Sequence, residues 1–321
     1  MREASFIRQN KEKWINFESK ILGNSKTDPK ELSNLYIHTM SDLAYAQTYY
    51  PKSKTIKYLN SLAAQAHLKI YQNKKIEKNR FVYFFKTDVP LLMYKYRKFL
   101  YISFAFFFLF VGVGVISAYN DISFVRLILG DQYVNMTLEN IENGDAMAVY
   151  SSSSSWGSHI GITINNIRVG LLNYVTGIFG GIGTLVIFFQ NSVMLGAFQY
   201  FFYEYGVFGE SIRAIWIHGS MEIFAIVIEA MAGFILGASL LFPRTFSRFN
   251  SFKQGFRDSF KIVISTFPFT IAAGFLEGYV TRLSSQMPSV FSVLIILITL
   301  STISFYYIIY PILVNRKINN I

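Results

Sequence analysis

The chain has 321 residues, of which 52% are hydrophobic and only 15% are charged. Soluble domains carry roughly 25% charged residues, so most of this chain is not an ordinary soluble protein. The net charge of +11 lies in residues 1–98, which hold 19 Lys and Arg against 8 Asp and Glu. The absence of cysteine excludes disulfides, thiolate metal sites and cysteine nucleophiles.

The basic N-terminal part is predicted to be helical. Apolar residues recur at helical spacing over residues 3–22, which predicts a first helix. In the stretch TDPKEL, Asp28 fits an N-cap and Pro29 the first helical position of a second helix, which is expected to end at Tyr50. A third helix is predicted over residues 53–73. No apolar region follows the N-terminus, so no cleaved signal peptide is expected.

Residues 77–98 contain both aromatic side chains and Lys and Arg. This composition favours an interfacial helix, with rings in the headgroup layer and cations facing anionic lipid. The alternative is a plain soluble amphipathic helix. We therefore expect residues 1–98 to form a basic cytoplasmic helical domain with an interfacial helix near its end.

Residues 99–321 are predicted to form a transmembrane domain of about six helices. Stretch 191–206 is short for a crossing at about 1.5 Å per residue. It could pair with the preceding stretch as a re-entrant segment, but a full crossing keeps the charges of the loops consistent and is preferred. The expected spans are 99–119, 168–189, 191–206, 212–242, 262–281 and 289–313.

The loop charges predict the topology. Loop 120–167 holds five acids and one arginine, whereas loop 243–261 and the C-terminal tail are basic. By the positive-inside rule, both termini lie in the cytoplasm and loop 120–167 is exterior. The prediction is a multi-pass protein of the bacterial cytoplasmic (inner) membrane. Within the exterior loop, residues 125–141 predict a surface helix and SSSSSWGSH (151–159) a flexible tract.

Small residues recur within the spans and favour close helix packing. They suit contacts between helices, and self-association into a homodimer is plausible for the same reason. They do not form a phosphate-binding loop, which requires a strand before the glycines and a helix after them. The glycines selected as packing positions are Gly177, Gly181, Gly219 and Gly233.

Three ionisable residues lie in the apolar stretch 212–242. At 100° per residue, Glu222 is about 40° and Glu229 about 20° from His218, so all three share one stripe. A charged group facing lipid costs about 2.5–3.5 kcal/mol at the helix centre. The stripe is therefore expected to face the bundle interior or a wet cavity.

The predicted topology brings further polar residues towards the outer half of the same region. A ligand site, a proton relay, a metal site and a buried network that fixes helix packing all remain open. His218 and Glu222 are weak metal candidates, because two ligands do not make a site. The ligand or proton candidates are His218, Glu222, Glu229, Glu277, Arg282, Asn165, Asn166 and Arg168.

Catalysis and nucleic-acid binding are not predicted. The sequence contains no HExxH, GxSxG or Walker motif, so no enzyme activity and no cofactor are expected. The basic segment lacks a nucleic-acid reader motif, which favours anionic membrane lipids or an acidic protein as its partner.

The chain resembles the stage II sporulation protein M family, also called the DUF95 membrane proteins. The resemblance rests on NNIRVG at 165–170, GIFGGIG at 177–183, NSVMLG at 191–196 and HGSMEIFAIVIEAMAG at 218–233. The HG-x-x-E element, formed by His218, Gly219 and Glu222, is the most specific part. Many relatives have Asn-Gly where this chain has Asn191-Ser192.

The resemblance implies an integral membrane protein without assigned catalysis, whose namesake anchors peptidoglycan-degrading partners during engulfment. We therefore expect a non-enzymatic membrane scaffold or anchor for a cell-envelope complex, with other cell-envelope proteins as partners. The first alternative is a transporter or channel component that uses the His/Glu stripe. The second alternative is a membrane metal-binding protein.

Overall fold

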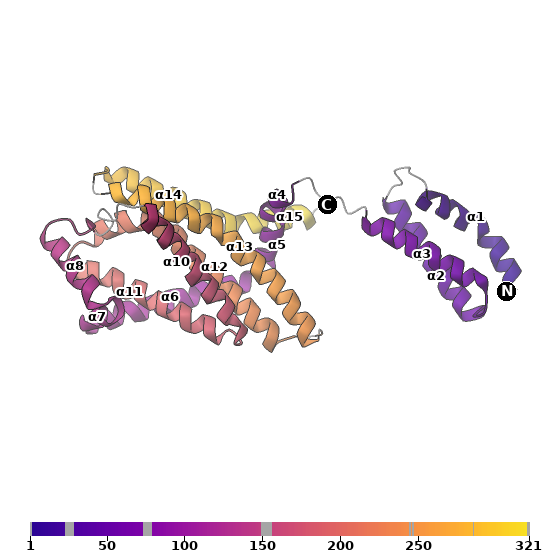
Figure 1. The fold of residues 1–321 in the computed structure, drawn as a ribbon, viewed down its shortest axis with the longest axis horizontal. Coiled ribbons are helices and arrows are strands. Elements are labelled where there is room, and N and C mark those ends of the chain that lie inside the picture. The colour runs from indigo at the N-terminus through magenta and orange to yellow at the C-terminus, as the bar shows by residue number, and fades with distance from the viewer. Residues whose placement is uncertain are drawn as a thin grey trace. The chain divides into compact units, whose positions relative to one another are not determined.

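The computed structural model describes residues 2–22, 29–72, 79–148, 156–243, 245, 247–284 and 286–319, which form helices and no strand (Figure 1). The chain divides into two compact units, Met1–Arg80 and Phe81–Ile321. The all-α fold class is confirmed. The boundary lies after Arg80, and not after residue 98 as predicted, because residues from 81–98 belong to the hydrophobic core of the second unit. We call this second unit, Phe81–Ile321, the membrane unit.

The N-terminal unit contains the three predicted helices, α1 (Glu3–Leu22), α2 (Pro29–Tyr49) and α3 (Lys54–Gln72). The predicted N-cap residue Asp28 lies outside the described residues. Each helix buries one apolar face in a shared core that includes Trp14, Phe17, Leu43 and Leu59. This unit therefore has a hydrophobic core of its own.

Polar side chains also connect the helices of the N-terminal unit. The indole Nε1 of Trp14 donates a hydrogen bond of 2.8 Å to Asp42 Oδ2, which joins α1 to α2. The hydroxyl of Tyr58 donates one of 2.8 Å to Glu18 Oε2, which joins α3 to α1. Burial and the hydrogen bond with Glu18 raise the pKa of Tyr58 to about 12.

A helical segment over residues 80–95, here called the entry segment, starts at the boundary between the two units, and the membrane unit continues from it into a bundle. The entry segment consists of α4 (Arg80–Tyr83), the π-helix η1 (Phe84–Asp88) and α5 (Val89–Lys95). The remaining elements are α6 (Arg97–Asn120), α7 (Ser123–Leu129), α8 (Asp131–Glu142), α10 (Trp156–Val175), η2 (Thr176–Ile178), α11 (Ile182–Glu204), α12 (Phe208–Leu241), α13 (Arg248–Tyr279), η3 (Thr281–Leu283), α14 (Ser289–Ser304), η4 (Phe305–Ile309) and α15 (Tyr310–Asn319).

Five stretches of the described chain are long and apolar enough to cross a membrane: Arg97–Asn120, Ile182–Glu204, Phe208–Leu241, Arg248–Leu283 and Ser289–Ile318. Helix α10 also belongs to the bundle and runs alongside α12 in the same direction. Its Asn166 contacts Glu222, and its last turns approach Gly233. Helix α10 is not one of the five, because its asparagines and Arg168 lower its mean hydropathy.

The predicted spans 168–189 and 191–206 are wrong in their boundaries. The helix break falls at Gly180 and Gly181, whose φ angles of 66° and 85° suit glycine. Helix α11 then continues without interruption through residue 191, where the Asn191 amide donates to the Ile187 carbonyl. Residues 191–204 are therefore part of a 23-residue helix that is long and apolar enough to cross a membrane.

Two predicted loops also need correction. Loop 243–261 is helical from Arg248, because the Ser247 hydroxyl caps the first turn of α13 by accepting from the Asn250 amide. The helix predicted over residues 125–141 is present as two helices, α7 and α8, which Gly130 separates at a φ of 85°. Loop 120–167 also contains the first half of α10. The predicted flexible tract is helical from Trp156 onward, and residues 151–155 lie outside the described residues.

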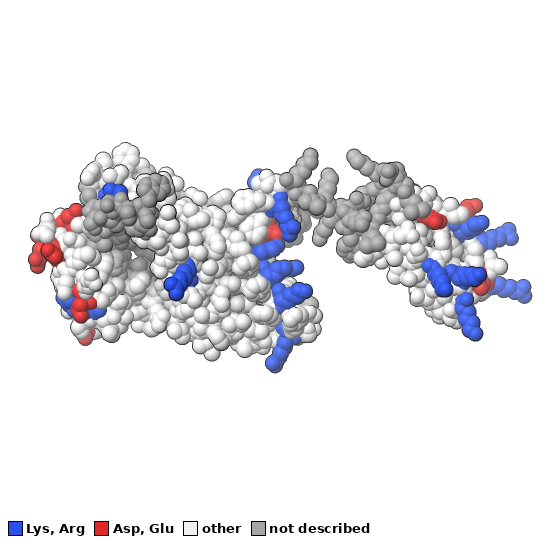
Figure 2. Space-filling view, viewed as in Figure 1, with Lys and Arg blue, Asp and Glu red and all other residues white. Residues whose placement is uncertain are grey.

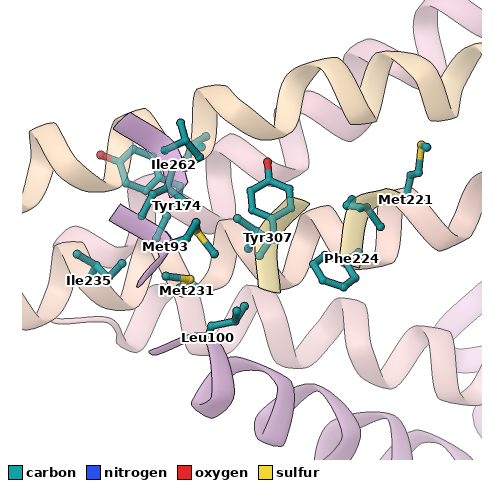
Figure 3. Packing of buried hydrophobic residues seen from close by; sticks show 14 of the residues in the cluster. Met93, Leu100, Tyr174, Met221, Phe224, Met231, Ile235, Ile262 and Tyr307 are labelled. Atoms are coloured by element: carbon teal, nitrogen blue, oxygen red, sulfur yellow. The ribbon is translucent and has the colours of Figure 1, made fainter. Parts of the chain in front are cut away.

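Helix α12 lies at the centre of the bundle and contributes most of its core. Figure 3 shows Met221, Phe224, Met231 and Ile235 of this helix packed among residues from α10, α13, the entry segment and the C-terminal region. Their partners in Figure 3 include Tyr174, Ile262, Met93 and Tyr307. A helix buried on nearly every side must be mostly apolar, so the polar residues of α12 indicate where a functional site could lie.

The membrane unit carries opposite charges at its two ends. Figure 2 shows Asp and Glu around α7 and α8, and a band of Lys and Arg at the opposite end, where the entry segment and the start of α13 lie. Ion pairs hold these basic-end elements together. Lys95 Nζ lies 2.7 Å from Asp258 Oδ2, and Lys261 Nζ lies 2.6 Å from Asp88 Oδ2.

Candidate functional site

A cavity of about 510 Å³ lies between α10, α11, α12 and α13, at the end of the bundle that carries α7 and α8. Six residues predicted as ligand or proton candidates line it. Arg168 and Arg282, the two basic candidates, do not. The polar lining consists of Asn165, Asn166, Asn191, Ser192, His218, Glu222, Glu229, Thr270 and Glu277, together with Tyr133.

His218 and Glu222, the first two residues of the stripe, contact residues outside α12. Asn166 Nδ2 of α10 donates a hydrogen bond of 2.7 Å to Glu222 Oε1. His218 Nδ1 lies 2.9 Å from Thr281 Oγ1, and His218 Nε2 lies 3.9 Å from Glu277 Oε1. The stripe is therefore buried between α10 and the end of α13, as its position on an apolar helix predicts.

Glu229 lies further along α12 than His218 and Glu222, and its carboxylate contacts both α10 and α13. Its Oε1 accepts a hydrogen bond of 2.8 Å from the Thr266 hydroxyl of α13. On the opposite side, its carboxylate occupies the space that a side chain on Gly170 of α10 would need, since a Cβ there would lie 2.2 Å from Oε2. Only 3% of Glu229 is exposed, so its environment is set by protein contacts.

Sequence reasoning missed several residues of this region. Thr266, Thr270, Asn191 and Ser192 are polar residues inside apolar stretches, the same signal that identified the stripe. Gly170 lies against the Glu229 carboxylate, and nothing in the sequence shows that contact.

The predicted packing glycines behave differently from one another. A Cβ on Gly177 would lie 2.2 Å from the Gly233 carbonyl oxygen, and a Cβ on Gly233 would lie 2.2 Å from Thr184 Oγ1. Gly181 serves the turn before α11 through its positive φ. The prediction for Gly219 is not supported, because a Cβ there would make only ordinary contacts of 3.7 Å or more. Gly219 instead lines the cavity.

The cavity is acidic, with apolar walls. Among the described residues, no Lys or Arg lines it or forms an ion pair with Glu222, Glu229 or Glu277. Within the same residues, no group of three or more His, Cys, Asp or Glu side chains is arranged to hold a metal ion. The metal alternative therefore has no support from geometry. The arrangement suits a polar or cationic solute more closely than a bare ion.

Comparisons with known proteins identify families over two parts of the chain. The pattern of a family described as Stage II sporulation protein M matches residues 103–282, which is more than half of the chain and includes the whole stripe. A family described as Domain of unknown function (DUF8413) matches residues 4–72, within the N-terminal unit. The searches of curated proteins and of solved structures returned no match. The chain is therefore a helical membrane protein that belongs to the stage II sporulation protein M family.

Proposed function

We propose that this protein is a non-enzymatic membrane scaffold for a cell-envelope complex, anchored by the membrane unit and binding a partner through the N-terminal unit. One observation carries the proposal: the N-terminal unit is a compact three-helix unit with its own core, separate from the membrane unit. Such a unit is not needed to complete the bundle, so it is available to bind another protein.

The charge of the N-terminal unit supports an acidic partner. Residues 1–80 contain 15 Lys and Arg against 7 Asp and Glu. Lys52, Lys54 and Lys57 are exposed near the start of α3. A surface with this excess of positive charge favours association with acidic proteins and anionic headgroups.

The proposed location is the bacterial cytoplasmic membrane, with both termini in the cytoplasm. The basic band of the membrane unit lies at the end that carries the entry segment and the start of α13, and acidic residues gather around α7 and α8 (Figure 2). The positive-inside rule assigns the basic end to the cytoplasm.

The scaffold is tested by crosslinking the full-length, tagged protein in its native membranes and quantifying the co-purified proteins by mass spectrometry. We expect one or more partners in stoichiometric amounts, and weaker recovery for the Lys54→Glu/Lys57→Glu variant. Arg316→Glu/Lys317→Glu is the matched control, because it reverses two exposed charges on α15 of the membrane unit. Purification without any stoichiometric partner would remove the scaffold proposal.

The cavity favours a second candidate function, a transporter or channel component. Ionisable residues inside a membrane bundle commonly mark ion or substrate pathways. The test is proton flux into vesicles containing the purified protein, under an imposed pH gradient. Flux that Glu222→Gln abolishes and Glu210→Gln leaves intact would support transport, since Glu210 is exposed on the same helix. Flux equal to that of empty vesicles would remove this candidate.

A further inference from the structure

We propose that the cavity between α10, α11, α12 and α13 binds an organic ammonium cation, whose charged group lies between Glu222 and Glu277. This inference does not depend on the scaffold role. It gives a ligand class to the cavity on which the transport candidate rests, and binding is measurable without transport.

The first argument concerns the charge of the side chains that line the cavity. Three carboxylates, those of Glu222, Glu229 and Glu277, line one cavity. Throughout the described part of the chain, no Lys or Arg lies within ion-pairing distance of any of them. An ionised carboxylate removed from water without a charged partner is costly, and a cation bound between Glu222 and Glu277 would offset that cost.

The second step is the unused hydrogen-bonding capacity at the site. Asn166 donates to only one oxygen of Glu222. No described residue donates a hydrogen bond to Glu277, and its ion-pair contact among the described residues is with His218 Nε2 at 3.9 Å. An ammonium group offers up to three N–H donors and no acceptor, which suits a pair of carboxylates.

An independent observation on the opposite wall also indicates a bound molecule. Ser192 of α11 lines the cavity and is only 2% exposed. Its hydroxyl is buried and makes no hydrogen bond with any residue that the structure describes. Buried hydroxyls are nearly always hydrogen-bonded, so a ligand that fills the cavity would supply the missing partner.

The size and walls of the cavity identify the cation as organic. A cavity of about 510 Å³ has the size of pockets that hold small organic molecules and is far larger than a bare ion needs. Phe107, Tyr133 and Phe198 contribute aromatic rings to the walls. Aromatic faces bind apolar groups and attract ammonium cations through their quadrupoles.

Glu229 is not assigned to the ammonium group. Its carboxylate already accepts from Thr266 and fills the space above Gly170. These contacts account for its position as part of the packing between α10, α12 and α13. Glu222 and Glu277 are the carboxylates with oxygen atoms that accept no hydrogen bond from a described residue.

The experiment is calorimetric titration of the full-length protein in dodecyl maltoside with phenethylammonium. Phenethyl alcohol and phenylacetate serve as neutral and anionic probes of nearly the same shape. We expect phenethylammonium to bind and the other two to bind at least tenfold more weakly. Equal affinity for the alcohol, or no measurable binding of the cation, would overturn the proposal.

Variants test the assigned residues. A hydrogen bond to a charged group is worth about 1.5–3 kcal/mol, so Glu222→Gln and Glu277→Gln should each weaken binding roughly ten- to a hundredfold. Glu210→Gln, on the exposed start of α12, should leave it unchanged. Unchanged melting temperatures must accompany these results. Binding that survives both cavity substitutions would overturn the assignment.

A titration with added lipid distinguishes the two possible sources of the ammonium group, a lipid headgroup and a free amine. Phosphatidylethanolamine or phosphatidylglycerol is added to the micelles before the titration. Competition by phosphatidylethanolamine alone assigns the site to a lipid headgroup, and no competition assigns it to a free amine. Ammonium binding without proton flux would retain the site and remove proton transport, so the binding site and proton transport are tested separately.

Discussion

The carboxylate of Glu229 lies where a side chain on residue 170 would stand. A Cβ built on Gly170 would be 2.2 Å from Oε2 and 2.5 Å from Oε1 of Glu229. Glycine is needed here for close approach, and the backbone of α10 at this point is ordinary helix. A small residue on α10 and a long acidic one on α12 thus set how closely the two helices pack.

Gly170→Ala should destabilise the membrane unit by about 1–3 kcal/mol, the usual cost of placing an extra methyl in a filled space. The measurement is the melting temperature of the full-length protein in dodecyl maltoside, followed by circular dichroism. Gly161→Ala is the control on the same helix, because a Cβ there meets nothing within 4 Å. Equal effects of the two substitutions would contradict the contact.

The Gly170–Glu229 contact also predicts a coupled pair. Removing the carboxylate by Glu229→Ala leaves room for a methyl at position 170, so the double variant should be more stable than the sum of the two changes predicts. A coupling of roughly 0.5–3 kcal/mol is expected for residues in contact. Strict additivity would show that the two residues do not share this space.

The interface between α6 and α11 should be as sensitive to an added methyl group as the contact between Gly170 and Glu229. A Cβ on Gly114 would lie 2.2 Å from the Val193 carbonyl oxygen, which is backbone and cannot move aside. Gly114→Ala should therefore cost about 1–3 kcal/mol. Gly112→Ala, two residues away in the same helix, meets nothing within 4 Å and should be neutral or slightly stabilising. The same melting measurement compares them.

Tyr58→Phe should destabilise the N-terminal unit by about 1 kcal/mol, through loss of the hydrogen bond to Glu18. The pKa of Tyr58 is raised from 10.0 to about 12, so this contribution is present below pH 10 and is lost as pH rises towards 12. Urea unfolding is followed by Trp14 fluorescence in a Trp156→Phe/Trp216→Phe background. Tyr49→Phe, at a residue 63% exposed, is the control.

Lys95→Met should loosen the entry segment from α13, because the substitution removes the ion pair between Lys95 and the buried Asp258. Burial lowers the pKa of Lys95, but hydrogen bonds to Asp258 and Tyr96 raise it overall. The contribution is therefore present below the ordinary value of 10.5 and lost as pH rises through the higher folded value. Lys95 is 45% exposed, so solvent screening limits the effect to about 1 kcal/mol.

The measurement for Lys95→Met is hydrogen exchange over residues 80–95 at neutral pH, together with melting temperatures from neutral to alkaline pH. Lys253→Met is a matched control, because Lys253 is exposed on α13 and forms no ion pair with any described residue. Faster exchange in both variants alike would show that the ion pair does not hold the entry segment.

The sequence by itself determined the helical class, the membrane domain, the three N-terminal helices and the polar stripe on α12. These features follow from local causes. Apolar runs predict spans, Pro29 marks a helix start, and 3.6 residues per turn place His218, Glu222 and Glu229 on one face. The family resemblance depended on the same local motifs and was confirmed over residues 103–282.

Only the tertiary structure decided where helices break inside apolar sequence and which residues meet across them. The turn at Gly180 and Gly181 lies within residues 174–189, which contain no charged residue and no proline, so hydropathy could not locate it. The partners of the stripe depend on contacts between residues far apart in the chain, such as Asn166 with Glu222 and Thr266 with Glu229. Periodicity tells which face of a helix is buried, whereas packing in three dimensions determines what that face touches.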